Sequence, residues 1–216
     1  EPGCLLQVNG GAPMAMEQPL QPGQAQSGLS MQRWWSFSEM VTSGIQNPYQ
    51  DEQHALAEVE QALSQSVARQ RIADVPLGAF LSGGIDSSLI VALMQNQGGA
   101  KVKTYTIGFE DPAYDESGHA FAVARHLGTE HTSVTVTAAE AQAVIPTLGH
   151  MYDEPFADSS QIPTHLVCKA ARQHVTVALS GDAGDELFGG YNRYFWGPKI
   201  WNKLSWLPFP VRRVAG

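Results

Sequence analysis

Two short segments rich in small and polar residues have the composition of a phosphate-binding site. The first reads Leu-Ser-Gly-Gly-Ile-Asp-Ser-Ser over residues 81–88 and lies between apolar runs at 75–81 and 89–94. The second reads Leu-Ser-Gly-Asp-Ala-Gly-Asp-Glu over residues 179–186. A strand that leads through such a loop into a helix presents free backbone N–H groups, and its glycines let the backbone approach an anion closely. The pattern therefore predicts a phosphate site at the first loop.

The residues of the first loop restrict its chemistry. Residues 81–88 contain no lysine, and the chain has neither the Gly-x-x-x-x-Gly-Lys-Ser/Thr motif nor a Gly-x-Gly-x-x-Gly after an expected strand. Asp86 stands at the expected start of a helix, where its carboxylate would repel a triphosphate unless a cation lay between them. Mg²⁺ prefers carboxylate and phosphate oxygens and would remove that repulsion. The alternative is that Asp86 and Ser87 only cap a helix.

The two loops together carry a family resemblance. The string Ser-Gly-Gly-Ile-Asp-Ser at 82–87 resembles the pyrophosphate loop of the ATP pyrophosphatases, which cut ATP between its α and β phosphates and adenylate a substrate. Residues 180–191, Ser-Gly-Asp-Ala-Gly-Asp-Glu-Leu-Phe-Gly-Gly-Tyr, are similar to the signature Ser-Gly-Glu-Gly-Ala-Asp-Glu-Leu-Phe-Gly-Gly-Tyr of glutamine-dependent asparagine synthetases. With Pro-Phe-Ala-Asp-Ser-Ser at 155–160, the resemblance covers roughly residues 40–205.

The resemblance implies a role for each loop residue. It implies that the phosphates of ATP are bound by Ser82, Gly83, Gly84, Asp86 and Ser87. It implies that the adenosine part is contacted by Leu81, Ile107, Ser180 and Gly181. It implies Mg²⁺ ligands at Asp86 and Asp185, and catalytic roles for both of these residues and for Asp182.

The implied reaction is ATP-dependent amide formation through an acyl-adenylate: aspartate, ATP and ammonia from glutamine give asparagine, AMP and pyrophosphate. Asp182 departs from the signature, which has glutamate at the position tied to formation of the acyl-adenylate. The Gly-Asp variant resembles amidotransferases of surface-polysaccharide pathways, so another acceptor carboxylate stays open. A truncated domain that binds nucleotide without catalysis is the further alternative.

The order of expected elements indicates how these loops are positioned. Apolar runs predict strands over 75–81, 102–109, 131–136 and 175–179, and periodic segments predict helices from His54 and over 87–97, 116–127 and 161–174. Thr137 and Glu140 have the spacing of a capping box. This alternation predicts an α/β fold with a doubly wound parallel sheet of the ATP pyrophosphatase (adenine nucleotide alpha hydrolase-like) type. Ser82, Ile107 and Ser180 then follow strand carboxyl ends, where such sheets bind ligands.

The ends of the chain differ from its middle. By the resemblance, residues 1–40 are a remnant of an amino-terminal glutaminase domain plus a linker. Short strands are expected at 5–8 and 33–37, and a flexible linker or long loop over 10–30. Residues 41–216 are then the ATP-binding synthetase domain, truncated at its carboxyl end. The aromatic tail, which contains Trp196, Trp201 and Trp206, is expected to form a helix that covers the core or docks a partner.

Composition limits the remaining partners. The net charge of the 216 residues is −8, which argues against nucleic acid, and the chain has two cysteines far apart without a Cys-x-x-Cys pair. A cytoplasmic protein without membrane contact is expected. The expected partners are a small carboxylate substrate and ammonia from a glutaminase domain missing here, and a homodimer of the full-length form stays open.

Overall fold

The computed structural model describes residues 2–10, 18–113, 115–155, 157–209 and 212–213. The chain forms two compact units, Glu1–Val59 and Glu60–Gly216. The division into residues 1–40 and 41–216 stays a prediction.

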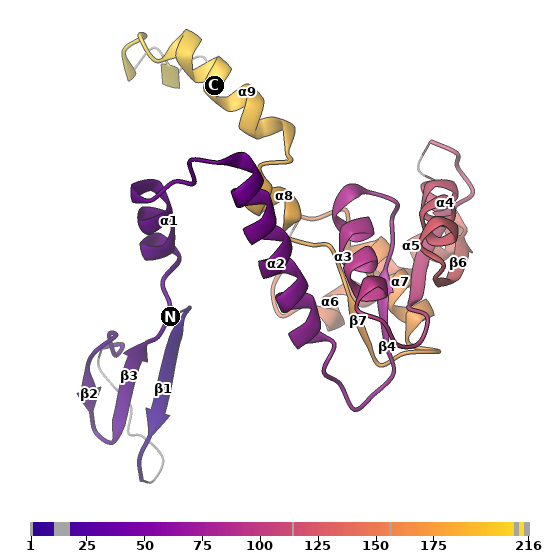
Figure 1. The fold of residues 1–216 in the computed structure, drawn as a ribbon, viewed down its shortest axis with the longest axis horizontal. Helices are drawn as coiled ribbons and strands as arrows, with labels where there is room; N and C mark the ends of the chain where they lie inside the picture. Colours follow the sequence, from indigo (N-terminus) through magenta and orange to yellow (C-terminus); the bar gives the residue numbers. More distant parts are fainter. Residues whose placement is uncertain (1, 11–17, 114, 156, 210–211, 214–216) are drawn as a thin grey trace. The chain divides into compact units, whose positions relative to one another are not determined.

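The first unit contains a small antiparallel sheet in the order β1-β3-β2 (Figure 1). Its strands are β1 (Cys4–Val8), β2 (Ala25–Gln26) and β3 (Leu29–Arg33). The linker expected over 10–30 is therefore wrong for its last part, because Gln26 and Leu29 pair across a tight turn in which Ser27 and Gly28 have φ of 53° and 80°. The strand expected at 33–37 is also wrong, since β3 ends at Arg33.

Helix α1 (Phe37–Gln46) follows the small sheet and was not expected from the sequence. Its N-cap is Ser36, whose hydroxyl accepts a hydrogen bond from the Glu39 backbone N–H at 3.4 Å. Helix α2 (Glu52–Gln70) comes next, and its residues from Glu60 onward belong to the second unit. This helix confirms the periodic segment that begins at His54.

The second unit contains a parallel sheet in the order β6-β5-β4-β7. The strands are β4 (Leu77–Phe80), β5 (Lys103–Phe109), β6 (Glu130–Val136) and β7 (Val177–Leu179). The first two crossovers contain α3 (Ile85–Asn96) and α4 (Ser117–Leu127). The last crossover contains α5 (Ala138–Val144), η1 (Ile145–Thr147), α6 (Leu148–Met151) and α7 (Gln161–Ala171). All four expected strands of this unit are thus confirmed.

Local signals explain where several of these elements begin and end. Helix α4 ends at Gly128, which has the left-handed φ of 71° that favours glycine. Helix α5 begins with the expected capping box, in which the Glu140 N–H donates to the Thr137 hydroxyl at 3.2 Å and the Thr137 N–H donates to the Glu140 carboxylate at 2.9 Å. Both signals were visible in the sequence, so these boundaries are close to the predicted ones.

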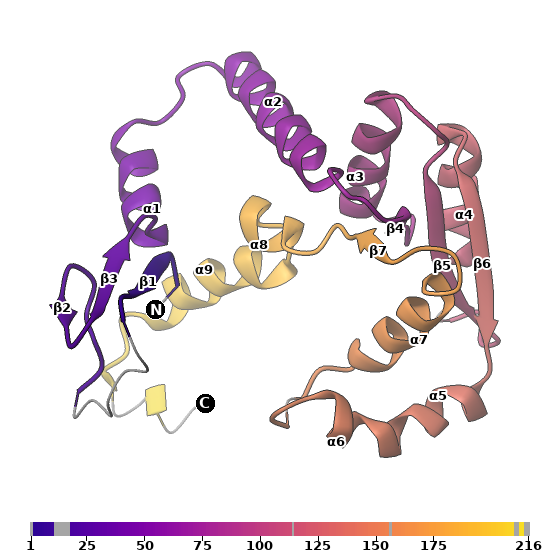
Figure 2. The same cartoon turned by 90° about the horizontal axis from the view of Figure 1, so that it is seen from below.

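Apolar residues pack on both faces of the parallel sheet. On one face, Ala79 and Leu81 pack with buried residues of α3 and α4 such as Val91 and Ala124. On the other face, Phe80 packs in a second cluster with Ala171 of α7, among other residues. Figure 2 shows α3 and α7 on different sides of the sheet. The predicted doubly wound α/β sheet is therefore confirmed.

The strand order places a switch point between β4 and β7. From β4 the chain moves through β5 to β6, and it then crosses back to pair β7 with the free edge of β4. Neighbouring crossovers leave on opposite faces at such a point, which opens a crevice beyond the carboxyl ends of the two strands. The two loops singled out in the sequence follow β4 and β7.

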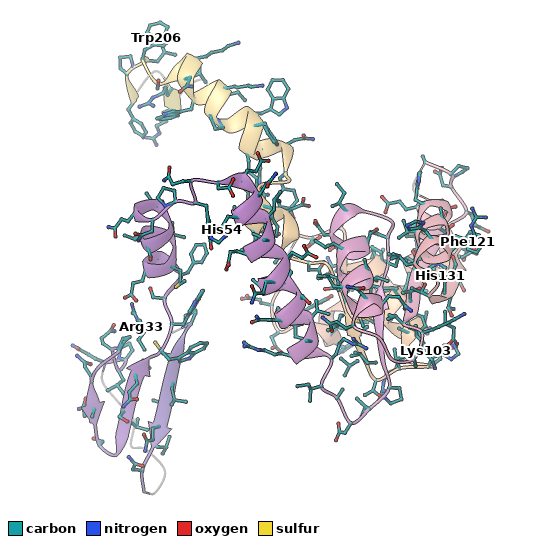
Figure 3. All side chains as sticks on the ribbon, viewed as in Figure 1. Arg33, His54, Lys103, Phe121, His131 and Trp206 are labelled. Atoms are coloured by element: carbon teal, nitrogen blue, oxygen red, sulfur yellow. The ribbon has the colours of Figure 1, made fainter. Side chains whose placement is uncertain are left out.

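The described carboxyl-terminal part contains α8 (Gly184–Phe188) and α9 (Asn192–Leu204). The helix expected in the aromatic tail is confirmed, while its role stays a prediction. Trp196 and Trp201 are 60% and 58% exposed, and Trp206, labelled in Figure 3, is 76% exposed. Across the described ranges, no helix combines the length and hydropathy needed to cross a membrane.

Candidate functional site

The loop after β4 is held together by its own serine hydroxyls. The Ser87 side chain is buried, and its Oγ lies 3.3 Å from the Ser82 N–H nitrogen, 3.0 Å from Ser82 Oγ and 3.3 Å from the Gly84 carbonyl oxygen. The Gly84 N–H in turn donates to Ser82 Oγ at 3.2 Å. These bonds fix the backbone of the turn before α3 begins.

Helix α3 starts without a side-chain cap. Its N-cap is Gly84, which makes no side-chain cap bond, and the Ser88 N–H donates to the Gly84 carbonyl at 3.1 Å. The alternative in which Asp86 and Ser87 only cap the helix is therefore wrong. The first N–H groups of an α-helix have no acceptor within the helix and form the positive end of its dipole. The start of α3 is thus suited to an anion.

The loop after β7 touches the first loop. A Cβ atom built on Gly181 would lie 2.5 Å from the backbone nitrogen of Ser87 and 2.7 Å from the carbonyl carbon of Asp86. Only a glycine allows this approach of two backbones. The Ser82 and Ser180 loops, both expected at strand carboxyl ends, therefore lie in contact.

Both loops line one cleft of about 1030 Å³. The expected residues found in its lining are Leu81, Ser82, Gly84, Asp86, Ser87, Ile107, Ser180, Gly181, Asp182 and Asp185. The expected phosphate residue outside the lining is Gly83. It has a φ of 83°, and a Cβ on it would lie 2.8 Å from the backbone of His119 and of Ala120. The absence of a side chain at Gly83 therefore lets the loop pack against the start of α4.

The lining also includes residues that sequence reasoning missed. Glu116 lies beyond the carboxyl end of β5, Asp158 lies three residues before α7, and Thr164 lies in the first turn of α7. Glu186 and Tyr191 belong to the second loop region. Glu116 could have been found from its position after a strand, and Asp158 from its position before a helix. Glu186 and Tyr191 could have been found from the signature at 180–191.

The cleft carboxylates differ in whether they accept hydrogen bonds. Asp182 Oδ2 accepts from the Ser180 hydroxyl at 3.0 Å, and Asp158 Oδ1 accepts from the Ser160 N–H at 2.8 Å. The Ser160 bonds lower the pKa of Asp158. Among the described residues, no group donates a hydrogen bond to the carboxylate of Asp86 or of Asp185.

Glu186 is also engaged. Its Oε1 accepts from the Tyr191 hydroxyl at 2.9 Å, and this bond raises the pKa of Tyr191. The guanidinium carbon of Arg193 lies 4.1 Å from the centre of the Tyr191 ring, a cation–π contact on the same tyrosine. The Glu186 carboxylate therefore accepts a hydrogen bond, whereas those of Asp86 and Asp185 accept none from the part of the chain that the structure describes.

The donor set fits a magnesium ion shared with a ligand. Within the described ranges, no group of three or more His, Cys, Asp or Glu side chains is arranged to hold a metal. Mg²⁺ is commonly held by one or two carboxylates together with substrate phosphates and water. Asp86 and Asp185 line the same cleft and could supply these two carboxylates.

These features define the class of protein. A doubly wound parallel sheet with a Ser-Gly-Gly loop at its switch point is the ATP pyrophosphatase type of α/β fold. The sequence matches the asparagine synthase family over residues 58–216, and the chain belongs to this family.

Curated relatives agree with this assignment. The chain is 43% identical over 148 residues to asparagine synthetase [glutamine-hydrolyzing] 1 of Bacillus subtilis, which covers 68% of this chain and 23% of that protein. It is 32% identical over 151 residues to asparagine synthetase B of Escherichia coli, covering 62% of this chain and 27% of that protein. The chain thus spans about a quarter of the length of these relatives.

A solved structure is similar at the level of the backbone. It is the glutamine-dependent NAD+ synthetase from Acinetobacter baumannii in complex with adenosine diphosphate, at 20% identity and a TM-score of 0.46. The match covers 74% of this chain and 30% of that one.

Proposed function

We propose that this chain is the ATP-binding synthetase part of a ligase that joins ammonia to a carboxylate through an acyl-adenylate. The observation that carries the proposal is the backbone contact between Gly181 and the start of α3 at Asp86 and Ser87. This contact brings the proposed phosphate loop, Asp86 and Asp185 to one cleft, which supports the proposal. The family and the names of its relatives support the same reaction.

In this proposal the first loop binds the pyrophosphate part of ATP. The N–H groups at the start of α3 and the hydroxyls of Ser82 and Ser87 bind its oxygens. The adenosine part lies along Ile107, Ser180 and Gly181. Leu81 is 1% exposed, so its contact with the nucleotide is made by its backbone while its side chain stays in the core.

Asp86 and Asp185 would hold Mg²⁺, which neutralises phosphate charge when bound. Neither side chain has a hydrogen-bond donor to displace among the described residues. In Asp182 and Glu186 one carboxylate oxygen already accepts a hydrogen bond, from Ser180 and from Tyr191, which leaves fewer lone pairs for a cation. This difference favours the first two carboxylates as ligands.

The proposed reaction has two steps. An oxygen of the substrate carboxylate attacks the α-phosphorus of ATP, and the bond to pyrophosphate breaks. Ammonia then attacks the activated carbonyl carbon, loses a proton and displaces AMP, which keeps the attacking oxygen. The loop N–H groups stabilise the charge that develops on the phosphates, and the cleft holds the two reactants together. Asp182 is proposed to act beside the acyl-adenylate.

The proposed source of ammonia is glutamine hydrolysed by a glutaminase domain, since the relatives are named glutamine-hydrolysing. Aspartate is the first candidate substrate. The second candidate substrate is a different carboxylate. Asp182 favours this alternative, because its side chain is one methylene shorter than the glutamate of the signature and accepts a hydrogen bond from the Ser180 hydroxyl at 3.0 Å. Nucleotide binding without catalysis is the remaining alternative.

The proposal is tested by pyrophosphate release. Wild-type protein is incubated with ATP, Mg²⁺, ammonium and aspartate, or with other carboxylates in its place. Release that requires a carboxylate and is lost in Asp86→Asn supports the proposal. The matched control is Asp74→Asn, the same change at an exposed position outside the cleft lining. Tight ATP binding without pyrophosphate release for any carboxylate would contradict ligase activity.

A further inference from the structure

Two glycines of the second loop region adjoin the carboxylates that lack donors. Gly184 and Gly190 are not among the glycines with positive φ, so their backbone conformation does not require glycine. Gly189, which lies between them in sequence, has a φ of 69° and nothing within 4 Å of a Cβ built on it. Gly189 is thus explained by its backbone conformation, whereas Gly184 and Gly190 need another reason.

The reason lies in the atoms that an added Cβ would meet. A Cβ on Gly184 would lie 2.5 Å from Oδ2 and 2.9 Å from Oδ1 of Asp86. A Cβ on Gly190 would overlap Oδ1 of Asp185 and lie 3.1 Å from its Cγ. Each glycine therefore leaves space that one carboxylate occupies.

We infer that Gly184 and Gly190 are positioning residues for the two proposed magnesium ligands. Gly184 leaves room for the Asp86 carboxylate, and Gly190 leaves room for that of Asp185. The inference rests on the proposed function, in which these carboxylates act on Mg²⁺ and ATP. The signature that this loop resembles has Gly-Ala where this chain has Ala183-Gly184, so the inference for Gly184 concerns the order of residues in this chain and not the family as a whole.

The contacts predict what a methyl group would do at each position. At Gly184 and Gly190 the closest atoms belong to a carboxylate, which can rotate away. At Gly181 they belong to the backbone of α3, which cannot. Alanine is also a better helix former than glycine, and Gly184 is the first residue of α8. Alanine at 184 or 190 should therefore displace a carboxylate without weakening the fold.

The experiment measures ATP binding by calorimetry as a function of Mg²⁺ concentration, together with the thermal midpoint. Gly184→Ala and Gly190→Ala should each raise the Mg²⁺ concentration for half-maximal ATP binding by about 10-fold or more, as expected when a group that orients a metal ligand is lost. Their thermal midpoints should not fall. The control Gly189→Ala should lower the midpoint through backbone strain and keep the Mg²⁺ dependence of the wild type.

The outcomes separate this inference from the proposed function. A wild-type Mg²⁺ dependence in either variant overturns the assignment for that glycine. A weakening of ATP binding that is the same at every Mg²⁺ concentration and accompanies a lower midpoint overturns it as well. If the wild-type protein binds ATP with Mg²⁺ but releases no pyrophosphate, the proposed ligase activity is contradicted. The Mg²⁺ dependence of ATP binding in the glycine variants still tests the inference in that case. Wild-type ATP binding that ignores Mg²⁺ overturns the inference.

Discussion

The two loops at the switch point are built in different ways. The loop after β4 is stabilised by the Ser82 and Ser87 hydroxyls and leads into the 12-residue helix α3. The loop after β7 leads into the five-residue helix α8 and carries Asp182, Asp185 and Glu186. In the proposed function, the first loop offers N–H groups and hydroxyls for the phosphates together with Asp86 for the cation, and the second loop offers the other Mg²⁺ ligand, Asp185. A site for ATP with Mg²⁺ needs both.

The difference also appears in how each backbone is constrained. In the first loop the left-handed residue is Gly83, for which this conformation carries no Cβ penalty. In the second loop a non-glycine residue, Ala183, has a φ of 73°. Asp182 and Gly184 flank this residue. The second loop thus keeps strain beside its carboxylates, while the first does not.

The largest expected effect comes from removing the charge of Asp185, the proposed Mg²⁺ ligand of the second loop. Asp185→Asn should lower carboxylate-dependent pyrophosphate release by about 100- to 1,000-fold, because charge stabilisation at the phosphates is lost. Initial rates at several Mg²⁺ concentrations measure the effect, and the thermal midpoint should stay unchanged. Unaltered rates at low Mg²⁺ would show that the second loop does not provide the cation site.

A change in the first loop should act differently. Ser87→Ala removes the hydroxyl that contacts Ser82 and Gly84. The Ser82 N–H, the Ser82 hydroxyl and the Gly84 carbonyl then each lose a hydrogen-bond partner. The loss should lower the free energy of unfolding by about 1–3 kcal/mol. It should also weaken ATP binding equally at all Mg²⁺ concentrations. Urea unfolding measures the change in stability, and calorimetry measures ATP binding. A change only in the Mg²⁺ concentration needed for ATP binding would contradict the different roles of the two loops.

Relieving the strain in the second loop is expected to stabilise the protein. Left-handed backbone costs a non-glycine residue about 1–2 kcal/mol, and the greater freedom of glycine in the unfolded chain offsets part of this gain. Ala183→Gly should therefore raise the free energy of unfolding by about 1 kcal/mol or less. Urea unfolding measures the change. A lower stability would show that Ala183 is not strained.

The smallest expected effect lies away from both loops, at His131 on β6. Its Nδ1 lies 2.9 Å from the Thr104 hydroxyl, its Nε2 is buried without a partner among the described residues, and burial lowers its pKa. The folded state therefore favours neutral His131, and its stabilising contribution is lost as the pH falls below about 6.5, the ordinary pKa of histidine.

His131 provides a control outside the two loops, because changing it should alter the pH dependence of stability without altering ATP binding. His131→Gln should show a smaller loss of stability than the wild type between about pH 7 and 5. Urea midpoints across that range measure it. The variant should leave the dependence of ATP binding on Mg²⁺ unchanged. An equal loss of stability in both proteins would show that His131 does not contribute.

Much of the second unit was predictable because its signals are local. Apolar runs such as Val102–Phe109 and stop signals such as Gly128 fix strands and helices within a few residues. The first unit was predicted less well, for two different reasons. Strand β2 has only two residues and depends on the turn at Ser27 and Gly28. Helix α1 was missed although Phe37, Met40, Val41 and Ile45 lie at helical spacing behind the N-cap Ser36.

The site was predicted in part for a related physical reason. Motifs predicted Asp86 and Asp185 as site residues, and both line the cleft, while their role as ligands stays a prediction. They did not identify Gly184 or Gly190 as positioning residues, because this role depends on where a carboxylate lies in three dimensions. They also gave no sign that the carboxylates of Asp182 and Glu186 accept hydrogen bonds from Ser180 and Tyr191, while that of Asp86 accepts none from any described residue.

The central claim is that this cleft adenylates a carboxylate. The most direct measurement uses aspartate labelled with ¹⁸O in its side-chain carboxylate, together with ATP, Mg²⁺ and ammonium, and follows the label by mass spectrometry. The account predicts one labelled oxygen in AMP and none in pyrophosphate, because the attacking oxygen stays on the α-phosphorus when ammonia displaces AMP. Label in inorganic phosphate, with ADP as the other product, would contradict the account.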